Sequence, residues 1–180
     1  RRDAHRAFFT RLLADLCAVD TTVGRDPADC AAGDAACGAI IGRILGTVLP
    51  LSAIVEKRPI DPAIVRRPEY TPPPGGRSAA EHFDDRYNVI ATVPGDAGRG
   101  IPMIYNAHID TVAPHIAPRV AGGRVYGRGA ADDKGSVALL LTALKALADL
   151  AAETRTAPPA PRVYQFVIEL WHLLHFAFTP

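Results

Sequence analysis

A long apolar helix followed by an apolar strand constrains the fold of this chain more than any other feature. From about Ser136 to Glu153, apolar residues recur at helical spacing, with Lys145 on the opposite face. The segment VYQFVIEL that comes later is mostly apolar, as is typical of a strand buried on both faces. Two β-rich runs, Tyr87 to Val93 and Ile101 to Ala107, precede the helix. Strands, a crossover helix and a further strand predict a layered α/β domain, with its chemistry at the loops beyond the strand ends.

The first half of the chain predicts two helices, a short strand and a proline-rich surface segment. Asp3 is expected to cap the first helix, and the second helix is expected to follow Asp34 and to stop at Pro50. A short strand is expected from Ser52 to Lys57, and the prolines from Pro59 to Ser78 argue against a regular helix or ladder there. The turn residues PGDAGRG between the two β-rich runs predict that these runs pair as a hairpin.

Composition excludes several classes of function. Of the 180 residues, 48% are hydrophobic, which is enough to bury most of one α/β core. The 20 basic and 19 acidic residues are spread along the sequence, so neither a nucleic acid nor a membrane is expected as a partner. Three cysteines without CxxC spacing, Cys17, Cys30 and Cys37, favour reduced thiols. Without an apolar run of membrane-spanning length or a secretory stretch, we expect a soluble, cytoplasmic protein.

The segment YNAHIDTV at the end of the second β-rich run places two polar side chains together. His108 and Asp110 are two residues apart, so in an extended chain they share one face. A carboxylate in that position can hold an imidazole in one tautomer for a metal ion. Taken alone, such a pair is more often a surface histidine beside a strand-end aspartate.

The segment VYGRGAADDKGSV leads into the long helix. Gly127 and Gly129 permit close backbone approach, and Asp132 and Asp133 lie just before the helix, where its dipole favours carboxylates. In isolation, capping of the helix is the simpler interpretation. A nucleotide loop is excluded, because Asp132 and Asp133 stand where the phosphate-binding motifs need glycine. GxSxG and HExxH motifs are missing from the sequence, and His172 and His175 lie in an apolar tail where a structural role is expected.

Taken together, YNAHIDTV, VYGRGAADDKGSV and the long helix resemble the zinc metallopeptidase and amidohydrolase family of acetylornithine deacetylase, succinyl-diaminopimelate desuccinylase and carboxypeptidase G. The resemblance is strongest from Tyr87 to Leu150. It implies a three-layer α/β/α catalytic domain of the zinc-exopeptidase type, with residues 1–169 as its amino-terminal part. It also implies two zinc ions, for which cobalt can substitute, bridged by an aspartate and by a hydroxide that attacks the amide of an N-acyl amino acid or short peptide.

The same resemblance assigns roles to three residues. His108 corresponds to a zinc ligand, and Asp110 to the catalytic-site aspartate that orients it. Asp132, rather than Asp133, corresponds to the bridging ligand, and the peptide bond after that ligand is often cis in the family. The implied chemistry is activation of water and polarisation of the scissile carbonyl by two close cations.

The sequence departs from the family pattern after the last strand. The family has a pair of acids there, close to EExGG, where this chain has Glu169 followed by Leu170 and Trp171. Later metal ligands, and the inserted domain that covers the site and forms the homodimer interface, are also missing. We therefore expect an incomplete metal site on a truncated piece of a hydrolase. Residues 170–180 are expected to be an aberrant apolar tail from a frameshift, a retained intron or a mispredicted gene end. The alternative is an inactive remnant or gene fragment with no enzymatic role.

Overall fold

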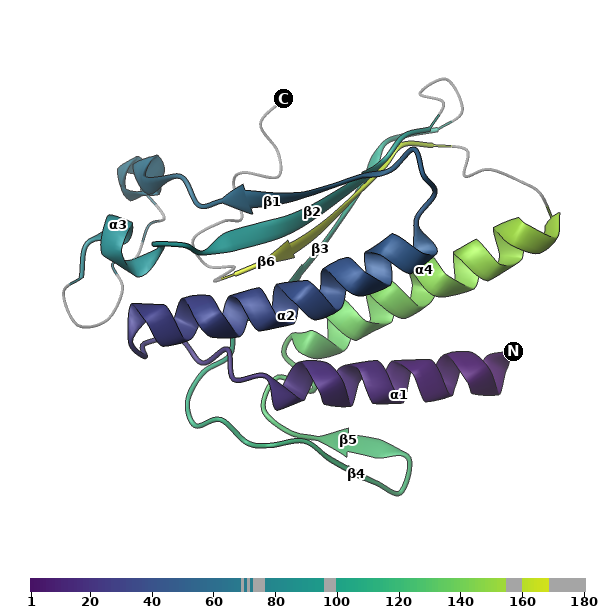
Figure 1. Cartoon of the computed structure of the whole chain (residues 1–180), viewed down its shortest axis with the longest axis horizontal. Helices are drawn as coiled ribbons and strands as arrows, with labels where there is room; N and C mark the ends of the chain where they lie inside the picture. The colour runs from purple at the N-terminus through teal and green to yellow at the C-terminus, as the bar shows by residue number, and fades with distance from the viewer. Residues whose placement is uncertain (69, 71, 73–76, 96–99, 155–159, 169–180) are drawn as a thin grey trace.

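A mixed four-stranded sheet forms the centre of the structure, a computed structural model that describes residues 1–68, 70, 72, 77–95, 100–154 and 160–168 (Figure 1). Its strands are β1 (Ile54–Pro59), β2 (Tyr87–Val93), β3 (Met103–His108) and β6 (Arg162–Val167), in the spatial order β1-β2-β6-β3. β1 and β2 pair antiparallel, as do β2 and β6, whereas β3 runs parallel to β6.

The two β-rich runs do not form the expected hairpin. Strand β6 lies between them, with Ala91 opposite Tyr164 on one side and Tyr105 opposite Tyr164 on the other. Turn residues between two strands favour a hairpin but do not require one. Here β6 follows a long helix, and it is the strand that completes the centre of the sheet. The hairpin prediction was therefore wrong, whereas the layered α/β arrangement is present.

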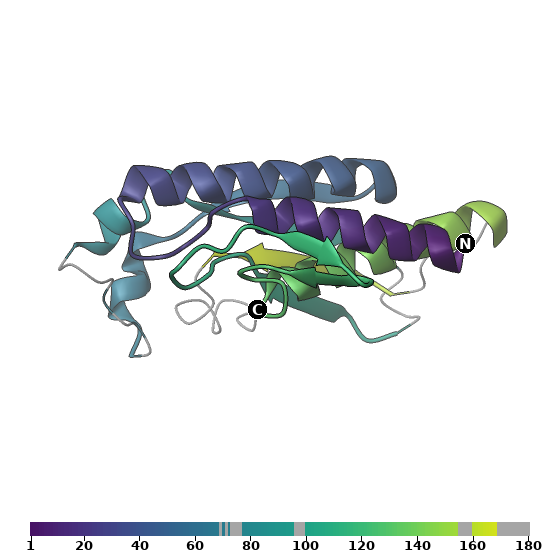
Figure 2. The ribbon, with the colours of Figure 1, turned by 90° about the horizontal axis from the view of Figure 1, so that it is seen from below.

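Three long helices accompany the sheet (Figures 1 and 2): α1 (Arg2–Ala18), α2 (Pro27–Val48) and α4 (Lys134–Thr154). Helices α2 and α4 pack on one face of the sheet, against β2 and β3 respectively, and α1 packs against α4. The core lies between these layers. Its fully buried members include Leu16 of α1, Ile41 of α2, Leu141 of α4 and Phe166 of β6.

Both amino-terminal helices begin elsewhere than expected. Helix α1 has Arg1 at its N-cap position without a side-chain cap bond, so Asp3 lies in the first turn and is not the cap. Helix α2 starts at Pro27, where the Asp26 carboxylate accepts a hydrogen bond from the Ala28 amide. Proline at the first helical position and aspartate before it form a standard helix start, and this signal was overlooked.

Asp34 has a structural role instead of capping a helix. It lies on the buried face of α2, and its Oδ2 accepts a hydrogen bond of 2.6 Å from Nε of Arg86, which precedes β2. The two side chains are 2% and 1% exposed. Because a buried charge is costly without a partner, this ion pair joins α2 firmly to the entry of β2.

The remaining elements are short. The 3₁₀ turn η1 (Pro62–Arg66) lies within the proline-rich segment, which therefore contains a short piece of regular structure. Helix α3 (Ala79–His82) begins directly after that segment. Strands β4 (Arg119–Ala121) and β5 (Arg124–Tyr126) form a hairpin beside α1 that was not predicted (Figure 1). Glu169 and the predicted aberrant tail at 170–180 lie outside the described residues.

Helices α2 and α4 each have the length and apolar composition of a membrane-spanning helix. Helices that pack on a sheet inside a protein core have the same composition. In this fold both helices pack against strands, with Ile41 and Leu141 fully buried. The buried share of the apolar window is 33% in α2 and 22% in α4, so the core accounts for part of their composition.

Candidate metal centre

The predicted ligand His108 is the last residue of β3, at the edge of the sheet. It pairs in register with Val167 at the end of β6, and the amide of Ile109 donates to the Val167 carbonyl. Because β3 and β6 are parallel, their carboxyl ends meet at the same edge. His108 therefore occupies the position where α/β sheets usually carry their chemistry.

A glycine-containing loop brings the second predicted ligand to this edge. Gly129 has a φ of +84°, and a β-carbon there would lie 2.9 Å from the side chain of Thr111. Glycine is therefore required for both the backbone angle and the close approach. The loop then passes through Asp132 and Asp133 into α4, which begins at Lys134.

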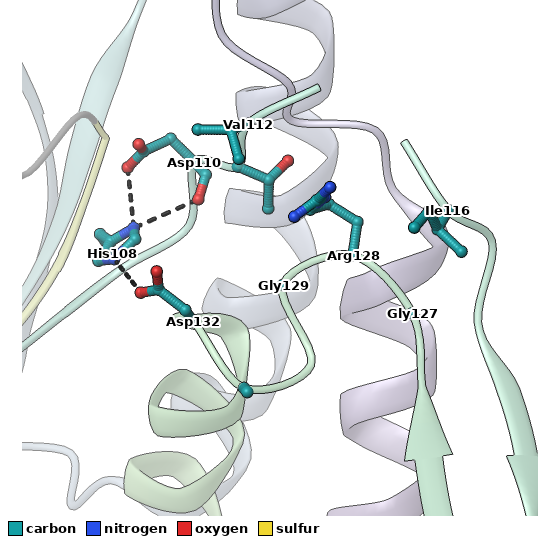
Figure 3. A pocket seen from close by; sticks show the side chains of 10 residues that line it. His108, Asp110, Val112, Ile116, Gly127, Arg128, Gly129 and Asp132 are labelled. Carbon is teal, nitrogen blue, oxygen red and sulfur yellow. Dashed lines mark hydrogen bonds and ion pairs between the residues drawn. The ribbon is translucent and has the colours of Figure 1, made fainter. Parts of the chain in front are cut away.

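The three predicted site residues lie together in the structure (Figure 3). The Nε2 atom of His108 is 3.1 Å from Oδ1 of Asp132, and its Nδ1 atom is 3.1 Å from Oδ1 of Asp110. The imidazole is thus held between two carboxylates from different loops. Its side chain is 14% exposed, whereas that of Asp132 is 90% exposed, so the arrangement opens to solvent on the Asp132 side.

The two adjacent aspartates have different contacts. Asp132 faces the imidazole, whereas Oδ2 of Asp133 accepts a 3.3 Å hydrogen bond from the backbone amide of His108. This difference agrees with the choice of Asp132 over Asp133 as the ligand. The peptide bond between them is cis, as the family resemblance implies.

The electrostatic environment of His108 is strongly anionic. The hydrogen bond from the imidazole to the Asp110 carboxylate raises the pKa of His108 to about 9. Burial opposes this rise in the pKa, and the negative charges of Asp110, Asp133 and Asp132 support it. The imidazole is therefore stabilised as a cation that donates to Asp110 and Asp132. The carboxylates around Nε2 thus favour a positive charge at this position.

The loop that carries Asp110 is fixed by a segment from the amino-terminal region. The Thr21 hydroxyl donates to the Ile109 carbonyl at 2.6 Å, and the Thr111 amide donates to the Thr21 carbonyl at 3.0 Å. The Val23 amide donates to the Thr111 carbonyl at 2.9 Å. Backbone on both sides of Asp110 is therefore held in place from residues 21–23.

Lys134 is a residue of this region that the sequence analysis missed. It is 1% exposed, and its Nζ donates a 2.8 Å hydrogen bond to the Val19 carbonyl at the end of α1. Burial lowers the pKa of Lys134. A lysine directly after two aspartates suggests a solvated charge, so the sequence gave no signal of its burial. Its contact joins the start of α4, next to the candidate ligand, to α1.

A cavity of about 410 Å³ opens beside His108 and Asp132. It is also lined by Asp110, by the loop after it, and by the glycine loop, including Val112, Ile116 and Arg128. Its volume falls in the range of pockets that hold small molecules. The candidate ligands therefore face a space large enough for part of a substrate.

The donor set suits zinc in type but not in number. In a tetrahedral zinc site with bonds of about 2.0–2.2 Å, neighbouring N and O donors lie about 3.3–3.6 Å apart. Nε2 of His108 and Oδ1 of Asp132 are 3.1 Å apart, so the two atoms would separate by a few tenths of an ångström to hold an ion, and Asp110 contacts the opposite ring nitrogen. No group of three or more acidic, histidine or cysteine side chains positioned for a metal occurs in the described part of the chain. The residues thus fit part of a zinc site.

Comparison with known proteins shows which families this part of the chain resembles. Residues 104–157, which contain all three site residues, match peptidase family M20/M25/M40. Succinyl-diaminopimelate desuccinylase of Methylococcus capsulatus is 41% identical over an alignment covering 27% of this chain and 15% of that protein. A protein described as a LysW-lysine/LysW-ornithine hydrolase from Pyrobaculum aerophilum is 43% identical over 34% of this chain and 17% of its own length.

Solved structures share the fold of this chain. Human carnosine dipeptidase 1 superposes with a TM-score of 0.67 and 18% identity, over 91% of this chain and 32% of the dipeptidase. The metallo-carboxypeptidase Sso-CP2 of Sulfolobus solfataricus, an M20 enzyme, gives a TM-score of 0.53 and 16% identity, over 88% of this chain and 30% of that chain. The expected fold class is therefore confirmed, and the chain spans about a third of the length of these relatives.

Residues 104–157 match the model of peptidase family M20/M25/M40, in agreement with the family resemblance. The fold around them is that of the family's catalytic domain. The structure also brings together His108, Asp110 and Asp132, and their roles as metal ligands and orienting residue stay predictions.

Proposed function

We propose that this chain carries part of the catalytic domain of a metal-dependent hydrolase that cleaves amide bonds in N-acyl amino acids or short peptides. The observation that carries the proposal is the contact of one imidazole with two carboxylates, Asp110 on Nδ1 and Asp132 on Nε2, at the edge of the sheet. The family of residues 104–157 and the names of the relatives support the same reaction class.

Each residue has a defined task in this proposal. His108 and Asp132 would hold zinc, and Asp110 would keep the proton of the imidazole on Nδ1, so that Nε2 could bind the ion once its own proton is lost. Bound zinc would supply Lewis-acid activation of water and of the substrate carbonyl, and cobalt would serve in its place. The partner is a small-molecule substrate in the adjacent cavity. We place the protein in the cytoplasm, which is consistent with its three buried free thiols.

Metal affinity follows from the number of donors. A complete structural zinc site contributes about 10–16 kcal/mol. Two donors in place of four would contribute roughly half of that, which corresponds to a dissociation constant of roughly 1–200 µM. We therefore expect weak binding by this chain.

A second candidate function is that of an inactive remnant. It is favoured by the small donor set, since the described residues contain no third donor positioned for the same ion. Both proposals assume the same family origin, and they differ in whether this chain catalyses hydrolysis.

Zinc titration followed by calorimetry tests the first proposal. Wild type should bind zinc in the micromolar range, and His108→Ala and Asp132→Ala should each abolish the heat signal. His5→Ala is a matched control, because His5 contacts Asp149 on α4, away from the cavity. Binding that survives His108→Ala would contradict the assignment. In the same samples, zinc-dependent turnover of N-acetyl amino acids would exclude the inactive remnant, and its absence would favour it.

A further inference from the structure

A second cavity, of about 310 Å³, lies at the end of the sheet opposite to the candidate metal centre. Arg162 at the start of β6 and Val93 at the end of β2 pair with each other and line it. His108 pairs with Val167 at the other end of β6, about 17 Å away along the strand. The carboxyl-terminal ends of α2 and α4 both point toward the end of the sheet where β6 begins (Figure 1). This cavity is therefore separate from the site proposed for hydrolysis.

Most of the wall of this cavity is apolar. Helix α4 contributes a stripe of side chains at helical spacing, and the end of α2 contributes others. The main apolar residues of the wall are Leu144, Leu147, Ala148 and Ala151 of α4, with Val48 and Leu49 at the end of α2. Leu144 is 6% exposed and Leu147 is 45% exposed, so the stripe runs from the core to the surface. An aliphatic group that entered the cavity would remove this apolar surface from water.

The principal polar groups of the cavity belong to β6. Arg162 and Tyr164 are two residues apart, so their side chains share one face of the sheet. Burial raises the pKa of Tyr164, and the positive charge of Arg162 and a hydrogen bond between the two side chains oppose this rise. Tyr164 is 4% exposed and stacks on Tyr105 of β3, with ring centroids 5.0 Å apart. The guanidinium is therefore held at the cavity wall by a hydroxyl that is itself fixed in the core.

The positive charge of Arg162 has no carboxylate partner among the residues that the structure describes. Its hydrogen bond there is to the neutral Tyr164 hydroxyl, which leaves the charge uncompensated. The carbonyl groups in the last turns of α2 and α4 carry partial negative charge, which would weaken the binding of an anion beside them by about two- to fivefold. A charge-assisted hydrogen bond to a guanidinium strengthens binding by about ten- to 100-fold. The guanidinium therefore prevails for an anion that lies at Arg162 on the sheet.

We propose that this cavity is a second ligand site, which binds a monocarboxylate with an aliphatic tail of medium length. The carboxylate lies on Arg162, whose planar N–H donors match its geometry, and the tail lies between α2 and α4. The volume of about 310 Å³ is near the lower end for small-molecule pockets, which favours a tail of medium length over a long one. The inference goes beyond the proposed function and requires neither a metal ion nor hydrolysis.

Three probes test the charge and the tail separately, each added to the full chain in a chelating buffer without metal. Octanoate carries the carboxylate, octanamide carries a neutral amide in its place, and hexanoate has a tail shorter by two methylene groups. Binding is followed by calorimetry and by the Nε–H resonance of Arg162 in proton–nitrogen correlation spectra. We expect octanoate to bind about fivefold more tightly than octanamide and to shift the Arg162 resonance. It should bind about four- to fifteenfold more tightly than hexanoate, for half to full burial of the two methylene groups.

Variants separate the charge of the site from its apolar wall. Arg162→Gln should remove the preference for octanoate over octanamide, and Arg162→Lys, which keeps the charge, should retain part of it. Ala148→Leu places a larger side chain in the cavity and should weaken both eight-carbon probes while Arg162 is unchanged. Arg43→Gln is a matched control, because Arg43 is exposed on α2 and does not line the cavity. Dispersed amide spectra verify that each variant is folded, and the wild-type comparison of probes decides the matter if one is not.

Several results would overturn the inference. These are equal binding of octanoate and octanamide, binding of neither probe, or octanoate binding that neither Arg162→Gln nor Ala148→Leu weakens. His108→Ala distinguishes this inference from the proposed function, since it should abolish zinc binding and leave the affinity for octanoate unchanged. Loss of octanoate binding in His108→Ala would place the probe at the other cavity and would also overturn the inference. Failure of wild type to bind zinc, with octanoate binding intact, would refute only the metal centre.

Discussion

Replacement of Asp110 by asparagine removes one charge beside His108 and keeps the size of the side chain. In the wild type, Oδ1 of Asp110 is 3.1 Å from Nδ1 of His108, and the hydrogen bond to this carboxylate is the main reason that the pKa of His108 is raised to about 9. An asparagine oxygen can still accept a hydrogen bond from Nδ1. The neutral imidazole should therefore stay in place while the imidazolium loses its main stabilisation, and the pKa of His108 should fall to about 6–7.

The same substitution has a defined effect on stability. A rise in pKa from 6.5 to about 9 corresponds to about 3.4 kcal/mol in favour of the charged form. Both side chains are slightly exposed, 14% for His108 and 10% for Asp110, so solvent screening reduces this value, and we expect roughly 1–2 kcal/mol. Since the pKa is higher in the folded than in the unfolded state, this contribution is fully present below pH 6.5 and is lost as the pH rises through 9.

Two measurements test this reasoning. The carbon-bound ring protons of His108 give its pKa in the wild type and in Asp110→Asn by nuclear magnetic resonance titration. Urea unfolding at pH 6 and pH 10 gives the difference in the free energy of unfolding, which should favour the wild type at pH 6 and vanish at pH 10. A wild-type pKa near 6.5, or a pKa that stays near 9 in Asp110→Asn, would refute the assigned role of Asp110.

Three further predictions concern the fold around the site. Asp34→Asn removes the charge of the buried carboxylate that accepts from Nε of Arg86 and should lower the free energy of unfolding by about 3–5 kcal/mol, and a loss below 1 kcal/mol in urea unfolding would contradict it. Ser78→Ala removes the hydroxyl that accepts from the Glu81 amide, while the backbone amide of residue 78 can still donate to the Glu81 carboxylate; the change should cost about 1 kcal/mol in the same assay, and an unchanged midpoint would argue against the cap. Burial raises the pKa of Cys37 to about 12, so its thiol should resist iodoacetamide at pH 8 in the native protein and react once the protein is unfolded in urea. Labelling is detected by mass spectrometry, and rapid labelling of the native protein would disprove the burial of Cys37.

The site was easier to predict from the sequence than the order of the strands. His108 and Asp110 are two residues apart at a strand end, and Asp132 directly precedes a strongly periodic helix. Local spacing therefore placed each of them beside a strand or helix end, and the family resemblance joined them into one site. The strand order depends instead on which strands pair across long distances in the sequence. The position of β6 between β2 and β3 depends on its pairing with both strands, and turn residues carry no information about it.

Buried polar residues were the other features that the sequence did not reveal. Lys134 and Arg86 are both 1–2% exposed, although lysine and arginine are usually at the surface. Their burial depends on partners far away in the sequence, the Val19 carbonyl for Lys134 and Asp34 for Arg86. Such pairs become visible only when the fold brings them together.

The contacts of residues 19–23 have a consequence for any attempt to isolate the site. The family match begins at residue 104, yet the backbone around Asp110 is hydrogen-bonded to Thr21 and Val23, and Lys134 is bonded to Val19. A peptide reduced to residues 104–157 would hold every candidate donor but would lose the hydrogen bonds from residues 19–23. The segment between α1 and α2 therefore helps to set the distance between imidazole and carboxylate.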